Sequence, residues 1–443
     1  MNILRFNEWW ETGKVPADLY QQFKRPVLAD ILKCVEKRQV ITLVGLRRVG
    51  KTSILYQIIS HLLSSGIEPK NIFYFSFDEE AESLDAVLEK YREDILRRQW
   101  RDGRIYVILD EIQKASGWEN TIKKYYDLYP NIKFIIAGSS SLSVEKKTKE
   151  SLAGRVSDFY IKPFSFKEFL ELKGKKIEGK ILDLFNPDFN AMEGLWKDFI
   201  VSSDAIKTEF SNFLLTGGFP EIAEETEEKE IKKYIKNSVV DRILYYDIPR
   251  EFKIEEPDLM VKILKIIANN PGLTLDYQSM GSDLNRDRKT ISKYVFYLKL
   301  SFLLHLVYNF SKNVLTSEKK LKKGYPANTG LIFSLLEFEK SDELLSKSVE
   351  SLVAVSLDAM FFYKQYHEID VVLVKGKGLL PIEVKYQSQI SKSDTGPLLN
   401  FMDKFKLNTG LCITKDLFKK EIIDDRETKR IIFIPAWFFM LII

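Results

Sequence analysis

The sequence predicts an α/β protein in three parts. Through about residue 165, short apolar runs alternate with amphipathic stretches of helical spacing, which is typical of a parallel sheet with helices on both faces. From residue 166 to about 237 the pattern is helical, and we interpret it as a helical lid on the first domain. After about residue 340 the pattern changes to a helix, paired strands, a second helix and a last strand. We therefore predict domains at 1–237, 238–335 and 336–443, the last with an α/β fold.

The apolar runs of the first part are its expected strands, because each is short and alternates with stretches of helical spacing. These runs are Val40–Val44, Ile72–Phe77, Ile105–Leu109, Phe134–Ile136 and Asp158–Ile161.

Composition excludes several classes of protein. Hydrophobic residues make up 45% of the 443 residues and charged residues 29%, as in folded globular proteins. Two cysteines and three histidines are too few for a disulfide framework or a zinc hydrolase. The uncharged stretch Ile431–Ile443 has 13 residues and contains Pro435, whereas a membrane span needs about 20. We expect a cytoplasmic protein without a signal peptide or a membrane partner.

The first motif follows the strand that ends at Val44. Residues 45–52 read Gly-Leu-Arg-Arg-Val-Gly-Lys-Thr, the G-x-x-x-x-G-K-[ST] pattern between a strand and a helix. Glycines let the backbone N–H groups fold around phosphate oxygens, Lys51 reaches the β- and γ-phosphates, and the Thr52 hydroxyl completes a Mg²⁺ shell. The predicted nucleotide-binding residues in this loop are Gly45, Arg48, Val49, Gly50, Lys51, Thr52 and Ser53.

Two later strands also end in polar residues. Asp110 and Glu111 follow the run 105–109, and an acid at the tip of a buried strand is costly without a partner. We assign Asp110 to Mg²⁺ and Glu111 to the attacking water. The run 134–136 leads into Ser139, which is placed to sense the γ-phosphate. Together these features predict a P-loop NTPase that binds ATP with Mg²⁺.

These motifs resemble those of AAA-type P-loop ATPases of the additional-strand group, because the run 72–77 comes between the loop and the Asp-Glu strand. The chain is most similar to a prokaryotic and archaeal AAA family with a C-terminal domain of unknown function. The segments that carry the resemblance are 45–52, 109–113, 137–141, 152–155, 163–169 and 216–220. The resemblance implies ATP hydrolysis and a homo-oligomer. Arg155 is then a candidate arginine finger, with a structural ion pair as the alternative.

The segment from Arg286 to Lys323 is strongly basic. It holds ten basic and two acidic residues, a net charge of +8 in a chain whose total is +4. Helices are expected at 258–268, 276–284 and 287–300, followed by a strand at 303–310 and a Lys-rich hairpin at 312–323. This order is that of a winged helix, whose third helix would enter the major groove while the wing lies on phosphates. DNA, duplex or branched, is the expected partner.

Carboxylates near the C-terminal end form a third pattern. Asp370 opens one expected strand, and Glu383 and Lys385 share one face of the next, because residues i and i+2 of a strand point the same way. The spacing resembles the PD-(D/E)xK nuclease core, and this resemblance implies a nuclease-like fold, with Glu350 as an additional acid. Two such carboxylates can bind Mg²⁺. A plain cross-strand Glu–Lys pair is the alternative.

Three other functions compete with a DNA-acting ATPase. The first is an NTP-driven switch that binds a protein partner, and the second is an ATP-regulated metal-dependent nuclease. The third is a nucleotide-binding scaffold without turnover, against which the position of Glu111 argues.

Overall fold

The computed structural model describes residues 3–78, 83–138, 152, 154–175, 177, 182–311, 321–336, 341–423 and 429–443. The chain forms two compact units. One contains residues 1–162 together with 300–302, and the other contains residues 163–299 and 303–443. The helices at 166–237 therefore belong to the second unit, although the sequence led us to expect them in the first domain. Helix α7 packs on α9 and α19, and α10 packs on α16, so the apolar faces of these helices are buried within the second unit.

The first unit is built on a five-stranded parallel sheet in the order β2-β3-β4-β1-β5. This confirms the predicted α/β class. The strand that separates β1 from β3 is β4, whereas β2, which comes between them in the sequence, lies at the edge. Its strands are β1 Val40–Val44, β2 Ile72–Ser76, β3 Ile105–Asp110, β4 Ile132–Gly138 and β5 Val156–Tyr160.

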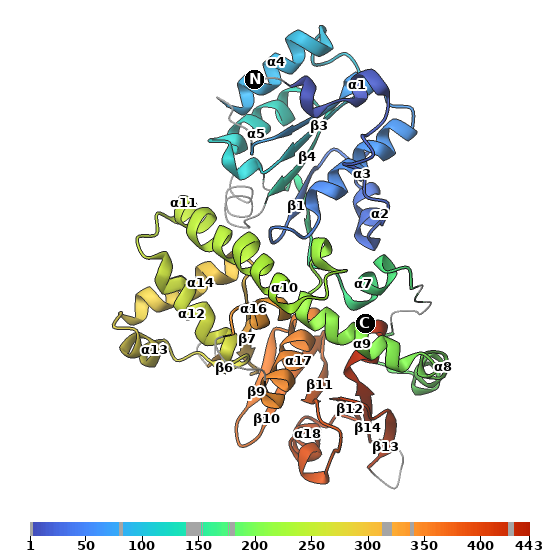
Figure 1. Cartoon of the computed structure of the whole chain (residues 1–443), viewed down its shortest axis with the longest axis vertical. Helices are drawn as coiled ribbons and strands as arrows, with labels where there is room; N and C mark the ends of the chain where they lie inside the picture. The colour runs from blue at the N-terminus through green and yellow to red at the C-terminus, as the bar shows by residue number, and fades with distance from the viewer. Residues whose placement is uncertain are drawn as a thin grey trace. The chain divides into compact units, whose positions relative to one another are not determined.

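Helices cover both faces of this sheet. The helices α2 and α3 pack together on one side, and α4 and α5 on the other (Figure 1). Strands β1, β3 and β4 are buried along their whole length, which explains their continuous apolar runs. The helices are α1 Trp9–Thr12, α2 Pro26–Leu32, α3 Lys51–Ser64, α4 Leu84–Tyr91 and α5 Trp118–Leu128.

The second unit begins with helices and continues into a helix–strand array. Helices α12, α13 and α14 and strand β7 lie where helices at 258–268, 276–284 and 287–300 and a strand at 303–310 were expected, whereas β6 was not expected. Most of the expected hairpin at 312–323 lies outside the described residues. The elements up to this point are α7 Phe166–Leu172, α8 Phe189–Ile200, α9 Ser203–Thr216, α10 Glu228–Tyr234, α11 Ile248–Phe252, α12 Pro257–Asn269, β6 Leu273–Thr274, α13 Tyr277–Asp283, α14 Arg288–Leu300, β7 Leu304–Asn309 and β8 Lys322–Pro326.

A nine-stranded sheet in the order β13-β14-β12-β11-β10-β9-β7-β8-β6 runs through the second unit. Strand β7 pairs in parallel with β9 at Tyr308 and Phe361, so the strands of the expected winged-helix region and of the C-terminal domain form one sheet. The remaining elements are α16 Thr329–Ser334, α17 Asp342–Ser356, β9 Phe361–Lys364, β10 Glu368–Lys375, β11 Gly378–Lys385, α18 Lys392–Phe405, β12 Thr409–Thr414, β13 Lys419–Ile422, β14 Arg430–Pro435 and α19 Ala436–Ile442.

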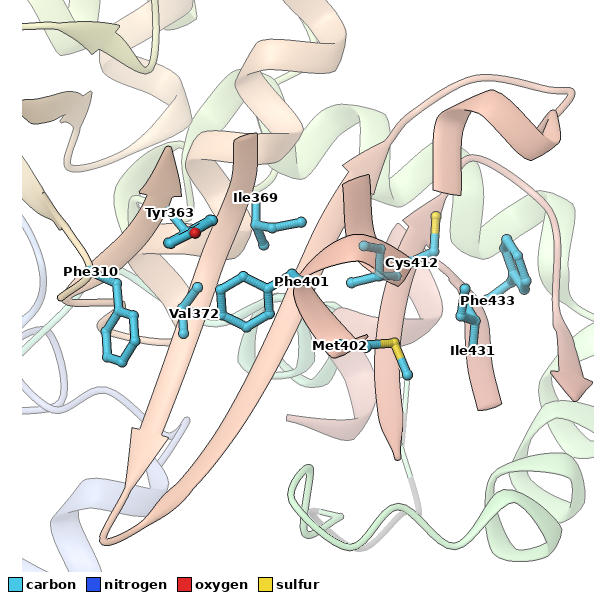
Figure 2. Packing of buried hydrophobic residues seen from close by; sticks show 10 residues of the cluster. Phe310, Tyr363, Ile369, Val372, Phe401, Met402, Cys412, Ile431 and Phe433 are labelled. Carbon is cyan, nitrogen blue, oxygen red and sulfur yellow. The ribbon is translucent and has the colours of Figure 1, made fainter. Parts of the chain in front are cut away.

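Helix α18 packs its apolar face on this sheet. Figure 2 shows Phe401 and Met402 of α18 against side chains of β10, β12 and β14, including Val372, Cys412 and Phe433. The stretch 431–443 forms β14 and the buried helix α19. None of the helices in the described ranges is both long enough and apolar enough to cross a membrane.

Candidate nucleotide site and carboxylate cluster

The loop between β1 and α3 has the backbone that its glycines predict. A Cβ on Gly45 would lie 2.1 Å from the carbonyl oxygen of Ile161, so only glycine fits beside the end of β5. Gly50 has φ +89°, a left-handed conformation, at the residue before α3. The loop therefore turns directly into the N-terminus of α3, where helix N–H groups and the helix dipole favour an anion.

Lys51 lies within this loop. Its side chain is only 5% exposed, and its Nζ donates to the carbonyl oxygens of Gly45 and Leu46 at 3.0 and 2.7 Å. Of the neighbouring predicted residues, Val49 is buried, Ser53 is half-buried and Arg48 is exposed with φ +66°. The ammonium group is thus held at the phosphate loop by the loop's own backbone.

Thr52 and Asp110 meet at the carboxyl edge of the sheet. The Thr52 hydroxyl donates to Asp110 Oδ2 at 2.6 Å, and the Tyr74 hydroxyl contacts the same oxygen at 3.3 Å. Asp110 ends β3 and is 2% exposed. Hydroxyl and carboxylate oxygens are ligands that Mg²⁺ prefers, so these two residues fit the ion that the motif implies.

Glu111 lies beside this pair in a left-handed conformation, with φ +49°. Its backbone N–H donates to Asp110 Oδ1 at 2.9 Å, and its carboxylate accepts a hydrogen bond from Gln113. Burial raises the pKa of the Glu111 carboxyl, and the charge of Lys51 acts in the opposite direction. A non-glycine residue in this conformation is typical of functional sites, where the surrounding structure holds the strain.

Arg25 supports the phosphate loop, although no sequence pattern points to it. This buried residue precedes α2, and its Nη1 donates to the carbonyl oxygens of Val49 at 3.2 Å and Lys162 at 2.8 Å. Arg25 thus ties the phosphate loop to the residues after β5. No motif surrounds it, and only the Pro26 that starts α2 marks the place in the sequence.

Arg155 is separated from the phosphate loop by the length of a strand. It precedes β5, its carbonyl accepts from Val40 N at 2.8 Å, and the loop begins at the other end of β1. Five residues of strand span roughly 16 Å. Its Nε lies 3.3 Å from Asp127 Oδ1, so the geometry is that of an ion pair and does not place Arg155 at the nucleotide of its own chain. The other expected polar residue, Ser139, lies outside the described residues.

The basic segment has one exposed face on α14. Arg288, Lys289, Lys293 and Lys299 are exposed there, together with Phe296, which is 51% exposed. Two other members of the segment are engaged elsewhere. Arg286 pairs with Glu256 at 2.5 Å, and Lys323, expected on the wing, is 2% exposed. Lys312, Lys319 and Lys320 lie outside the described residues.

Three residues of the nuclease-like pattern, Glu350, Asp370 and Glu383, are buried, and the fourth, Lys385, is half-buried. Glu350 comes from α17, Asp370 from β10, and Glu383 and Lys385 from β11. Lys385 Nζ contacts Glu383 Oε1 at 2.7 Å, and Asp370 Oδ2 accepts from Val384 N at 2.9 Å. Within this set the direct side-chain contact is the Glu383–Lys385 ion pair, which is the plain alternative that the sequence also offered.

Lysines that the pattern did not include enter this cluster. Lys323 Nζ lies 3.1 Å from Glu350 Oε1, 2.6 Å from Glu368 Oε1 and 3.7 Å from Asp370 Oδ1. Lys347 Nζ lies 2.7 Å from Glu350 Oε2, and the Tyr325 hydroxyl donates to Glu350 Oε1 at 2.6 Å.

The pKa values of the cluster's carboxyls reflect these neighbours. Burial opposes ionisation of Glu350, but the charges of Lys323 and Lys347 outweigh it and lower its pKa to about 2. Burial and the charge of Glu350 raise the pKa of Asp370 to about 6. Burial and the charge of Asp370 raise the pKa of Glu383 to about 8. The lysines thus stabilise the charge of Glu350 most strongly.

Family models match three successive parts of the chain. Residues 37–170 match an AAA domain, which supports a nucleotide-binding ATPase. Residues 207–342 and 347–439 match two domains of unknown function, DUF8612 and DUF4143.

Curated relatives span nearly the whole chain. An uncharacterized protein of Methanocaldococcus jannaschii is 28% identical over 92% of this chain and 86% of its own length. An uncharacterized protein of Haemophilus influenzae is 22% identical over 89% of this chain and 92% of its own length. Among solved structures, C. elegans PCH-2 is 16% identical, with a TM-score of 0.25, over 38% of this chain and 49% of that one. By the family matches, the chain combines an AAA domain at residues 37–170 with a DUF4143 domain at residues 347–439.

Proposed function

We propose that the protein is a Mg²⁺-dependent ATPase that acts on DNA through the exposed basic face of α14. The observation that carries the ATPase is the Thr52–Asp110 hydrogen bond at the carboxyl edge of the sheet, next to a phosphate loop that holds Lys51. A parallel sheet presents its ligands at this edge, and these residues are the ones that ATP and Mg²⁺ require there.

Each residue has a role in this proposal. The loop from Gly45 to Ser53 holds the phosphates with its N–H groups and with Lys51. Thr52 and Asp110 would hold Mg²⁺, which neutralises charge on the phosphates. Glu111 orients the water that attacks the γ-phosphorus atom, and its carboxylate lies where Lys51 influences its pKa. Hydrolysis releases ADP and phosphate.

DNA is proposed as the partner because α14 combines exposed Arg288, Lys289 and Lys293 in a helix–strand array of winged-helix order. A basic helix face supplies the phosphate contacts that dominate affinity for nucleic acid. The same face would also serve a switch that binds an acidic protein, and the exposed Phe296 within it suits either surface.

The test measures steady-state ATP hydrolysis with Mg²⁺, alone and with duplex, single-stranded or branched DNA. Lys51→Ala serves as the blank. We expect turnover that Lys51→Ala abolishes and that DNA stimulates severalfold. Turnover that no form of DNA changes would leave the ATPase in place and favour the protein-directed switch. Absence of turnover in the unchanged protein would favour the nucleotide-binding scaffold.

A further inference from the structure

The carboxylate cluster of the second unit contains a fixed cation of its own. Lys323 is 2% exposed, and its Nζ lies within 3.1 Å of Glu350 and Glu368 and 3.7 Å from Asp370. Its ammonium group also lies 5.3 Å from the centre of the Phe362 ring. A buried ammonium is stable only where opposite charges surround it, and these carboxylates supply them.

Lys323 reaches this position because of the sheet. It is part of β8, which pairs with β7, and β7 pairs with β9, so β8 and β10 belong to one sheet. Alternation along a strand places Lys323 and Lys322 on opposite faces. Lys322 is directed toward Tyr308, with its Nζ 4.7 Å from the ring centre. The two neighbouring lysines therefore have different surroundings.

A divalent cation does not fit among these side chains. The cluster has four carboxylates, those of Glu350, Glu368, Asp370 and Glu383. All but Glu383 already contact the Lys323 ammonium group, and Glu350 also contacts Lys347. The second oxygen of Asp370 accepts a backbone hydrogen bond from Val384. In the described ranges, no three His, Cys, Asp or Glu side chains are arranged to hold a metal. Glu383 Oε2 is buried without a hydrogen-bond partner, but it is a single oxygen beside the Lys385 ion pair.

We propose that the Lys323 ammonium group occupies the place that a metal ion would take in this nuclease-like cluster. The ammonium group then balances the buried carboxylates and stabilises the second unit. The second unit therefore does not catalyse metal-dependent cleavage of phosphodiester bonds. The proposal does not rest on the ATPase, because all of its residues lie in the second unit. It predicts that removing the ammonium creates a site for a divalent cation, since the buried carboxylates then need another counter-charge.

Mn²⁺ binding to the full chain without nucleotide tests the proposal. Electron paramagnetic resonance counts the Mn²⁺ bound to the unchanged protein, Asp370→Asn, Lys323→Met and Lys323→Met/Asp370→Asn. Lys322→Met is the matched control. We expect the first two proteins and the control to bind the same number of ions. Lys323→Met should bind one more, and the double variant should lose it. Mn²⁺ should also raise the unfolding midpoint of Lys323→Met by at least about 2 °C, and leave that of the double variant unchanged.

Two results would overturn the proposal. One is a Mn²⁺ ion in the unchanged protein that Asp370→Asn removes, because the cluster would then hold a metal beside Lys323. The other is a folded Lys323→Met protein that binds no additional ion. If Lys323→Met does not fold, the comparison of the unchanged protein with Asp370→Asn still tests the proposal. Both proteins keep Lys323, and the proposal requires that they bind the same number of Mn²⁺ ions.

Discussion

The hydroxyl of Thr52 donates to Asp110 Oδ2 at 2.6 Å, which joins the first turn of α3 to the end of β3. These residues are 58 positions apart in the sequence, and β4 lies in the sheet between β3 and β1, the strand that leads into the phosphate loop. The contact places a hydroxyl and a buried carboxylate beside the phosphate loop. If this pair holds Mg²⁺, then a substitution of either residue should reduce Mg²⁺-dependent hydrolysis of ATP.

Asp110→Asn should strongly reduce the rate of Mg²⁺-dependent ATP hydrolysis while changing the stability of the fold little. Asparagine keeps the size of the side chain and can still accept from Thr52, but it removes the negative charge that the metal needs. We expect turnover to fall by at least about 10²-fold, with an unfolding midpoint within a few degrees of the unchanged protein. Hydrolysis is measured over a range of Mg²⁺ concentrations. A variant with full turnover at ordinary Mg²⁺ would exclude Asp110 as a ligand.

Glu111→Gln should separate ATP binding from hydrolysis. The amide keeps a polar group at the left-handed position after β3 but cannot accept a proton or orient water as a carboxylate does. We expect turnover to fall by about 10²- to 10⁴-fold while ATP affinity changes little. Retention of radiolabelled ATP after filtration measures the bound nucleotide. Gln113→Ala, which removes the neighbouring hydrogen bond to Glu111, is the control and should reduce turnover far less.

Sequence patterns point to the residues of the candidate nucleotide site, but not to the residues that support them. Gly45, Lys51, Thr52 and Asp110 belong to a pattern whose spacing follows from the strand–loop–helix geometry, so they could be found without coordinates. Arg25 could not, because its role depends on two backbone carbonyls, at Val49 and Lys162, that only the folded chain brings near it.

The same distinction holds in the second unit. The pattern of Asp370, Glu383 and Lys385 identified one side of the carboxylate cluster. The charge count placed Lys323 on an exposed wing, but pairing of β8 with β7 directs its side chain into the cluster. A charge count does not tell which face of a strand a lysine side chain lies on, because that depends on the register of strand pairing. The division between units at residues 162 and 163 also depends on long-range helix packing, which periodicity does not contain.

Arg25→Ala should impair both stability and nucleotide binding. The change leaves two carbonyl oxygens without their charged donor, and each lost hydrogen bond of this kind costs about 1–3 kcal/mol. Since Val49 is part of the phosphate loop, we expect weaker ATP affinity at temperatures well below unfolding. Calorimetric titration with ATP and Mg²⁺ measures it. Arg38→Ala is the control, because Arg38 also donates to a backbone carbonyl, that of Tyr126, but before β1. Equal ATP affinity in both variants would limit Arg25 to a structural role.

Lys133 should make the free energy of unfolding rise with pH. This residue of β4 is fully buried, and its Nζ donates to the carbonyl oxygens of Cys34, Lys37 and Gln39 near the end of α2. Burial lowers the pKa of its ammonium to about 8 from 10.5. The unfolded chain therefore binds more protons between pH 8 and 10.5, so Lys133 favours folding increasingly as pH rises through that range.

Denaturant unfolding of the unchanged protein and of Lys133→Met at pH 7.5, 9 and 10 measures this contribution. The difference in unfolding free energy should grow with pH, toward a total of about 3 kcal/mol for the full shift. Lys24→Met is the control, since its side chain is exposed and its charge is not among those that shift the pKa of Lys133, so the pH slope should stay unchanged. A difference that stays constant or falls with pH would mean that Lys133 keeps its ordinary pKa in the fold.

Charge reversal on α14 should weaken binding to DNA. Lys289 and Lys293 are one helical turn apart on the exposed face, so Lys289→Glu/Lys293→Glu places two negative charges where we propose phosphate contacts. We expect duplex affinity to fall at least about 10-fold and the dependence of binding on salt to become shallower, because fewer counterions are released. Fluorescence anisotropy with a labelled duplex at several salt concentrations measures both. Lys236→Glu is the control, an exposed lysine between α10 and α11 outside this array, and it should leave the salt slope unchanged. If the double variant binds duplex DNA as tightly as the control does, the basic face of α14 does not contact DNA. The alternative, a switch that binds an acidic protein, is then tested by measuring whether such a protein stimulates ATP hydrolysis by the unchanged chain.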